Sequence, residues 1–254
     1  MKPVKLKVVT YNVLCSTDEA FAPRWELGRR RILAEQPDVI GFQETRPNQQ
    51  KMIADSLPDY AVLGFGRDPD FGGESNCVAF RRDAFTLFGF HQCWLSPTPF
   101  VPGTRFPEQS PCPRVCVTVL LKHRALPLPI RFYNTHLDHV SEQARVLGMS
   151  QVLRRIQADN DDWALPYVLT GDMNARPDSK PIRDALAFAA YPMKDVSANL
   201  TDSYHGFGRV TGEKIDYIFT NTATDAAPAV LWDDCENGVY ISDHYPVAAE
   251  LIFH

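Results

Sequence analysis

The chain has 254 residues with 44% hydrophobic content, enough for one large core, so we expect a single domain over residues 1–254. Its formal net charge of -5 argues against a protein that grips long duplex nucleic acid, because such proteins usually present a basic face to the phosphates. Six scattered cysteines without zinc-ligand spacing, and the lack of an apolar run of signal-peptide or membrane-span length, predict a cytoplasmic protein that makes no contact with a membrane.

The first half of the chain is predicted to alternate strand and helix before a series of strands. Hydrophobic periodicity predicts a strand at 6–12, a helix at 24–35, a strand at 39–44 and a helix that begins at Pro47. Five further apolar runs with short turns between them indicate a β-meander. These runs span residues 60–66, 76–82, 84–90, 115–123 and 130–137.

The second half is predicted to begin with a long helix, which Ser141 caps and which continues through Ile156. A strand at 167–172 and a short helix near 181–189 follow, and then strands near 214–220, 227–232 and 247–253. Strands interspersed with helices predict an α/β fold in which two packed sheets are flanked by helices.

Residues 92–114 stand apart from this pattern, with prolines at 97, 99, 102, 107, 111 and 113. Prolines at this density keep a segment out of helices and sheet ladders, and a long ordered loop in a compact domain is often functional. A surface excursion without a role is the alternative, and both stay open. If the loop is functional, its candidate substrate contacts are Trp94, Arg105, Phe106 and Arg114.

Short apolar runs along the chain repeatedly lead into a carboxylate, an amide or an imidazole. These polar residues are Asn12, Glu44, His136, Asp172, Asn174, Asp216, Asp243 and His244. Taken singly, each is explained as a turn residue, a cap or a hydrogen-bonded strand residue. Residues two apart in an extended segment share a face, however, so Asp172 and Asn174 can point at one target, as can His136 and Asp138.

Three acids in this series, Glu44, Asp172 and Asp243, follow apolar runs that can meet at one sheet edge. Unpaired carboxylates in one cleft repel each other unless a cation holds them. Magnesium prefers oxygen ligands, whereas a zinc site needs closely spaced Cys and His residues, and the chain has neither such a cluster nor a phosphate-binding Gly-x-x-x-x-Gly-Lys loop. A metal-assisted site for phosphoester cleavage is the leading hypothesis.

The order of these motifs resembles that of the endonuclease/exonuclease/phosphatase superfamily, and the bacterial or deadenylase-like branch in particular. The matching segments, between residues 8 and 252, are Thr10-Tyr11-Asn12, Gln43-Glu44, Asn134-Thr135-His136-Leu137, Gly171-Asp172-Met173-Asn174, Ile215-Asp216-Tyr217-Ile218 and Ser242-Asp243-His244. The resemblance implies a four-layered α/β sandwich of two mixed sheets flanked by helices, with the site on one edge. It also implies a divalent cation, usually Mg²⁺ or Mn²⁺.

The resemblance further implies a role for each matching residue. Glu44 would be the main metal ligand, with Asn12 beside it and Asp243 completing the metal side. Asp172 would orient or deprotonate the attacking water, and Asn174 would donate a hydrogen bond to a phosphate oxygen. Direct in-line attack of water is the simplest mechanism, since no serine, cysteine or histidine nucleophile is needed.

His136 and His244 would face the phosphate in the same comparison. Asp216 matches the acid that pairs with His244, and Glu74 matches the acid that supports the other histidine. Histidine has a reference pKa of about 6.5, and a neighbouring carboxylate raises it, so an Asp216–His244 pair favours imidazolium near neutral pH. Positive charge would then lie where negative charge develops.

Further candidate substrate contacts have ordinary alternatives. Asp138 and His139 either contact substrate or cap the helix that begins near Ser141. Arg145 either reaches a phosphate or is a surface arginine. His205, with Tyr204 and Phe207, lies just before the Asp216 strand and is a candidate for the pocket lining.

Three functions are weighed on this basis. The first is a divalent-metal phosphoesterase that acts on a phosphodiester or phosphomonoester, with a small substrate or a short, single-stranded nucleic acid favoured. The second is a nuclease on longer DNA or RNA, which predicts a contiguous basic track and steep salt dependence. The third is a non-catalytic binding module, which a lost ligand would suggest, whereas every motif position is filled. A monomer is assumed.

Overall fold

The computed structural model describes residues 3–222 and 227–254, so the first two residues of the expected domain and residues 223–226 lie outside it. The helices are α1 (Asp18–Glu35), α2 (Pro47–Ser56), α3 (Glu142–Asp162) and α4 (Lys180–Leu186). The first sheet has the strand order β11 (Val230–Leu231), β14 (Val247–Phe253), β1 (Val4–Asn12), β2 (Val39–Gln43), β4 (Val78–Arg81) and β3 (Tyr60–Leu63). The second has the order β5 (Phe85–Trp94), β6 (Val115–His123), β7 (Ile130–His136), β8 (Tyr167–Asp172), β10 (Asp216–Thr220) and β9 (Lys194–Asp195), and β12 (Cys235–Glu236) pairs with β13 (Val239–Tyr240).

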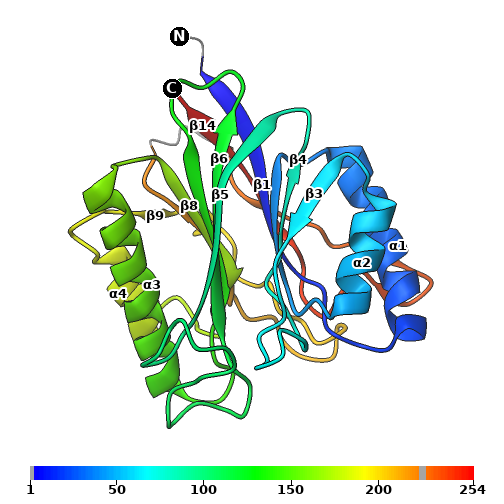
Figure 1. Ribbon diagram of the computed structural model, residues 1–254. Helices are drawn as coiled ribbons and strands as arrows, with labels where there is room; N and C mark the ends of the chain where they lie inside the picture. Colours follow the sequence, from blue (N-terminus) through cyan, green and yellow to red (C-terminus); the bar gives the residue numbers. More distant parts are fainter. Residues whose placement is uncertain (1–2, 223–226) are drawn as a thin grey trace.

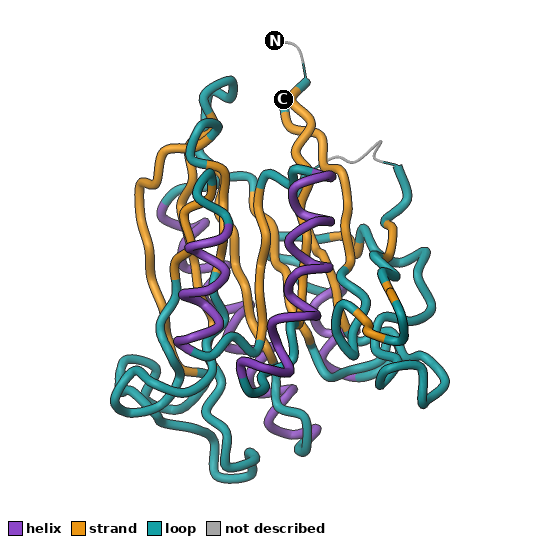
Figure 2. Tube along the Cα trace, turned by 90° about the vertical axis from the view of Figure 1, so that its right-hand side faces the viewer, coloured by secondary structure: helices purple, strands orange, loops and turns teal. Residues whose placement is uncertain are grey.

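The two large sheets pack face to face with helices on both outer faces, as Figures 1 and 2 show. One apolar cluster lies between the sheets, a second joins the first sheet to α1 and α2, and a third joins the second sheet to α3 and α4. The predicted α/β sandwich of two mixed sheets is therefore confirmed. Within residues 3–222 and 227–254, no helix is both long and apolar enough to cross a bilayer.

The predicted meander is wrong, because the chain changes sheets between β4 and β5. Strand β4 is a short apolar run and β5 a mixed one, and neither pattern says which sheet its strand joins. Strand β5 also continues to Trp94, which shortens the proline-rich loop at its start. Helix α1 begins at Asp18, six residues before the predicted start, with Pro23 accommodated inside it.

Strand direction gathers the polar residues at one edge. Strands β1 and β2 are parallel, as are β7 and β8, so their carboxyl ends meet there. Asp216 and His244 precede or begin strands rather than end them, but β10 and β14 are antiparallel to β8 and β1. Antiparallel strands begin where their neighbours end, and Asp216 lies opposite Asp172. The start of β1 and the end of β14 lie together at the other end of the sandwich (Figure 1).

Polar side chains tie the two sheets together beneath this edge. Gln43 Nε2 donates to Asn134 Oδ1 across the interface at 2.7 Å, and Asn134 Nδ2 donates back to the carbonyl of Phe42 at 2.8 Å. Gly41 allows this approach, because an added Cβ would lie 2.3 Å from Thr170 Oγ1. The sheets therefore hold a fixed spacing directly below the polar residues.

Candidate active site

A cavity of about 500 Å³ opens at this edge of the sandwich. The predicted residues that line it are Glu44, Glu74, Arg114, His136, His139, Arg145, Asp172, Asn174, Tyr204, Asp243 and His244. Arg67, Cys112, Glu213 and Ile215 complete the lining. Residues from both sheets and from the proline-rich loop thus meet around one space of a size that suits a small ligand.

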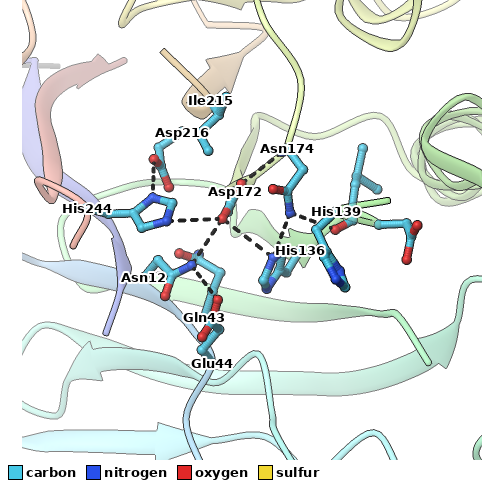
Figure 3. Close-up of polar contacts among 12 residues, drawn as sticks. Asn12, Gln43, Glu44, His136, His139, Asp172, Asn174, Ile215, Asp216 and His244 are labelled. Carbon is cyan, nitrogen blue, oxygen red and sulfur yellow. Dashed lines mark hydrogen bonds and ion pairs between the residues drawn. The ribbon is translucent and has the colours of Figure 1, made fainter. Parts of the chain in front are cut away.

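Asp172 lies at the centre of the polar contacts, as Figure 3 shows. Its Oδ2 accepts a hydrogen bond from Asn12 Nδ2 at 3.0 Å and lies 3.5 Å from His136 Nε2 and 3.8 Å from His244 Nε2. Its Oδ1 accepts from the amide of Asn174 at 2.8 Å. Burial raises the pKa of Asp172, and the Asp216 carboxylate adds to this, bringing it to about 7. A carboxylate with this pKa can exchange a proton near neutral pH.

His244 is paired with Asp216 as predicted, with 2.8 Å between Nδ1 and Oδ2. Burial alone would lower the pKa of His244, but the carboxylates of Asp216, Asp172 and Asp243 raise it to about 10. The ring is therefore an imidazolium at neutral pH. Its Nε2 side faces Asp172 (Figure 3).

His136 differs from His244 although both rings approach Asp172. Burial lowers the pKa of His136 well below its usual value, and the positive charges of Arg114 and Arg67 lower it further. Asn174 Nδ2 donates to His136 Nε2 at 2.9 Å and to the Leu137 carbonyl at 3.1 Å, which identifies a neutral ring that accepts at Nε2. Its Nδ1 has no hydrogen-bond partner among the described residues.

Glu74 does not support His136, contrary to the prediction. Its carboxylate pairs with Arg67 at 2.8 Å and accepts from Cys15 Sγ at 3.2 Å. Arg67 lies in a loop whose backbone pairs with that of Glu74, since the amide of Arg67 donates to the Glu74 carbonyl at 2.9 Å. Glu74 therefore forms its ion pair with Arg67 and not with His136, to which the motif comparison assigns it.

Glu44 and Asp243 are acids of the cavity that lack an arginine partner among the described residues, whereas Glu213 pairs with Arg176. Burial opposes ionisation of Glu44, but hydrogen bonds from Asn12 and from the Cys15 amide, together with nearby His244, lower its pKa. Burial raises the pKa of Asp243, and the charge of Glu44 raises it further. We call Glu44, Asp172 and Asp243 the carboxylate wall. A cation placed against this wall would relieve the repulsion between Glu44 and Asp243.

Asn12 is placed differently from the other predicted metal ligands. Its side-chain oxygen accepts from the Leu14 amide at 3.0 Å, which fixes the orientation of its amide group. Its nitrogen donates to Glu44 and to Asp172, each at 3.0 Å. The metal ligands left among the predicted residues are therefore carboxylate oxygens, which fit a hard divalent cation such as Mg²⁺ or Mn²⁺. Asn12 orients two of these carboxylates, those of Glu44 and Asp172.

Two site residues have left-handed backbones that turn their side chains after a strand end. Glu44 has a φ of 61° directly after β2, and Asn174 has a φ of 46° two residues after β8. Asparagine tolerates this region, but glutamate pays a conformational cost of order 1 kcal/mol there. Strain of this kind is often found where a side chain must be aimed at a ligand.

Asp138 is a structural residue rather than a substrate contact. It is buried, and its Oδ1 accepts from the amides of Val140 and Ser141 at 3.1 and 2.7 Å. Its Oδ2 accepts from the Ser110 hydroxyl, which ties the proline-rich loop to the start of α3. The predicted Ser141 cap is also present, with the Ala144 amide donating to Ser141 Oγ at 3.1 Å.

His205 is buried away from the cavity lining. Its ring stacks on Tyr245 with 3.8 Å between centroids, and its Nδ1 accepts from the Gly208 amide at 3.0 Å. The amide of His205 donates to the Asp243 carbonyl at 3.0 Å. The segment therefore holds the backbone of Asp243 in place, and the expectation of a direct substrate contact is not met.

A second wall of the cavity carries basic residues, and we call Arg114, Arg145 and His139 the guanidinium wall. Arg114 is 3% exposed, and its Nη2 donates to His139 Nδ1 at 2.8 Å. Arg145 is half-buried and donates from Nη1 to the Asp138 carbonyl at 3.0 Å. Reasoning from the sequence missed Arg67, whose only local signal is the glycine-rich stretch around it.

Comparison with known proteins agrees with this geometry. The family model described as "Endonuclease/Exonuclease/phosphatase family" matches residues 9–244. No curated protein matches the chain in a sequence search. The resemblance seen in the sequence motifs is nonetheless confirmed by the family match and by solved structures.

Three solved structures illustrate the likeness. A family member from Bacteroides thetaiotaomicron is 26% identical, with a TM-score of 0.89 and coverage of 100% of this chain and 96% of that one. Mannosyl-6-phosphatase Bt3783 from the same organism is 25% identical, with a TM-score of 0.85 and coverage of 98% and 100%. The human nocturnin catalytic domain, solved with a bound sulfate anion, is 17% identical, with a TM-score of 0.73 and coverage of 98% and 96%, which shows the fold alone.

Proposed function

Because the chain belongs to the endonuclease/exonuclease/phosphatase family, we propose that it hydrolyses a phosphodiester or phosphomonoester with a divalent cation, Mg²⁺ or Mn²⁺. One observation carries the proposal. Asp172 lies between an imidazolium and a neutral imidazole, beside two further cavity acids, Glu44 and Asp243, that have no cationic partner within ion-pair distance among the described residues. This combination supports activation of water beside a phosphoryl group.

In the proposed reaction, Glu44 and Asp243 hold the cation. When bound, the cation polarises the phosphoryl group and stabilises charge on the leaving oxygen. Asp172 orients the attacking water and accepts its proton, a role that its raised pKa of about 7 supports. Water attacks in line, so no covalent intermediate with the protein forms.

The histidines and Asn174 act on the phosphoryl oxygens in this proposal. The imidazolium of His244 supplies positive charge where negative charge grows. Asn174 donates a hydrogen bond to a phosphoryl oxygen when its Nδ2 gives up its contact with His136 Nε2 or with the Leu137 carbonyl, the two acceptors that it has without substrate. His136 offers its Nδ1 side, which has no partner among the described residues. Asp216 keeps His244 charged and oriented through the 2.8 Å contact.

A small or single-stranded substrate is favoured over long duplex nucleic acid. The net charge of -5 and a cavity of about 500 Å³ support this choice, as does the likeness to a mannosyl-6-phosphatase. A nuclease on longer DNA or RNA is the alternative, and a non-catalytic module is disfavoured by the filled motif positions. A cytoplasmic monomer is part of the proposal, and six free cysteines support a reducing compartment.

Metal removal tests the proposal. Chelation with EDTA should abolish hydrolysis of p-nitrophenyl phosphate and of its methyl ester, and excess Mg²⁺ or Mn²⁺ should restore it. Glu44→Gln keeps the shape of the side chain but weakens the cation site, so this variant should need much more metal for half-maximal rate. Activity that survives chelation would refute the metal requirement, and no activity on any phosphoester with either metal would refute the hydrolase.

A further inference from the structure

We propose that the guanidinium wall selects a terminal phosphoryl group that carries two negative charges, so that the preferred substrate is a phosphomonoester rather than an internal diester. This inference rests on the proposed phosphoester hydrolysis and specifies its substrate class. It starts from Arg114, a buried cation at the cavity that the reaction described above does not use.

Arg114 lacks the partners that a buried guanidinium normally has. The side chain is 3% exposed, yet its Nε and Nη1 donate to no acceptor among residues 3–222 and 227–254. The carboxylate of the buried Asp138 is its ion-pair partner, but Asp138 Oδ2 lies 3.8 Å from Nε, too far for a hydrogen bond, and also accepts from Ser110. Burial lowers the pKa of Arg114, and Arg67 lowers it further. A buried cation with unused donors beside a cavity is stabilised by an anion that enters it.

Apart from Asp138, the neighbours of Arg114 on this wall carry no negative charge. His139 accepts from Arg114 at Nδ1, which places the proton of a neutral ring on Nε2. Arg145 is held by the Asp138 carbonyl, an uncharged partner, so its charge is not cancelled there. Arg67, in contrast, pairs with Glu74 at 2.8 Å. Among the described residues, Arg145 therefore has no carboxylate within ion-pair distance, and Arg114 has only the long contact with Asp138, which leaves its Nε and Nη1 without a hydrogen bond.

The two walls explain why charge matters for substrate choice. The acids of the carboxylate wall offset part of the charge of a bound divalent cation, so further cationic side chains add to the attraction for an anion. A phosphomonoester carries a charge of about -1.5 to -2 near pH 7, whereas an internal diester carries about -1. The charge of Arg145 and the unused donors of Arg114 thus match the extra negative charge and the extra acceptor oxygen of a terminal phosphate.

The proline-rich loop holds Arg114 in place, which gives this segment a function. Ser110 donates to Asp138, and Gln109 Nε2 donates to the Cys112 carbonyl at 2.6 Å. Of the predicted contacts in this segment, Arg114 lines the cavity, whereas Trp94 donates its indole N–H to the Arg67 carbonyl and Phe106 packs in the core. Because these two hydrogen bonds already order the loop, Arg114 can bind an anion without a large loss of conformational entropy.

A pair of matched substrates tests the inference. p-Nitrophenyl phosphate and methyl p-nitrophenyl phosphate have the same leaving group and differ in one negative charge. With Mg²⁺, wild type should have the higher kcat/KM on the monoester. Arg114→Ala should lower kcat/KM on the monoester roughly 10- to 100-fold, the effect of losing hydrogen bonds to a charged group, and lower that on the methyl ester less than about threefold.

Controls separate substrate recognition from folding. Arg154→Ala removes an exposed arginine from the same helix as Arg145 and should leave the ratio of the two kcat/KM values unchanged. Arg114→Lys retains the charge without the planar fork and should recover part of the preference. If circular dichroism shows that Arg114→Ala is unfolded, Arg145→Ala decides, and it should lower the same ratio.

The outcomes discriminate between the two proposals. Equal losses on both esters, or a wild-type preference for the methyl ester, overturn the inference and leave phosphoester hydrolysis standing. If neither ester is hydrolysed, hydrolysis itself is contradicted, and calorimetric titration with orthophosphate in Mg²⁺ then tests the wall. Tighter binding to wild type than to Arg114→Ala supports it, and equal binding overturns it.

Discussion

The carboxylate wall and the guanidinium wall lie in one cavity, and the pKa values of the two histidines there are shifted in opposite directions. His244, with three carboxylates acting on it, has a raised pKa, while His136, near Arg114 and Arg67, has a lowered one. Both rings approach the same oxygen of Asp172. The difference shows that two buried histidines on one aspartate have opposite pKa shifts because carboxylates, with Asp216 foremost, surround His244, whereas burial and nearby arginines act on His136. The cavity is thus suited to a cation on one side and an anion on the other.

Asp172→Asn removes the carboxylate that both histidines approach, and we expect the largest effect from it. The turnover number should fall roughly 10²- to 10⁴-fold, the usual contribution of a general base. The thermal midpoint should stay unchanged or rise, because the variant removes a buried carboxylate that faces Asp216. Steady-state kinetics and thermal melts measure both, with exposed Asp178→Asn as the control. A variant with near wild-type turnover would remove Asp172 from the reaction.

The pH dependence of stability tests the charge on His244 in metal-free protein. Its folded pKa of about 10 exceeds the unfolded value of about 6.5, so its stabilisation is complete below pH 6.5 and is lost as pH rises to 10. The unfolding free energy of wild type should therefore fall more steeply than that of His244→Gln across this range. The difference in slope should approach about 1.4 kcal/mol per pH unit. Urea titrations at several pH values measure it, and parallel curves would contradict a raised pKa.

Gly41→Ala tests whether the two walls depend on the fixed spacing between the sheets. The added Cβ would lie 2.3 Å from Thr170 Oγ1 and 2.7 Å from Asn134 Oδ1, so the polar contacts between the sheets must shift. We expect a loss of about 1–3 kcal/mol in the free energy of unfolding, as for other overpacked sites, with a lower turnover number. Urea denaturation and kinetics measure this. Unchanged values for both would show that the spacing is not critical.

Much of this arrangement could be predicted because it follows from strand ends. Asp172 and Asn174 are two residues apart at the end of a buried strand, and the backbone N–H of Asn174 donates a hydrogen bond to Asp172 Oδ1. The Asp216–His244 pair was predicted from motif order and is present at 2.8 Å. These residues come with strong local signals, since each borders an apolar run.

Other features depend on tertiary partners that no local pattern reveals. Asn12 turns its oxygen to the Leu14 amide, and Glu74 turns to Arg67. The change of sheets between β4 and β5 likewise depends on which face of the sandwich is free. Arg114 could be named as a candidate from its loop, but its unpartnered nitrogens become evident only once the surrounding residues are in place.

Anomalous diffraction from crystals grown with Mn²⁺ and orthophosphate tests the central claim most directly. The account predicts a manganese peak between Glu44 and Asp243, and a phosphate that contacts Arg114 on its other side. Manganese bound away from these acids, or phosphate bound without the guanidinium wall, would contradict a cavity that pairs a cation with an anion.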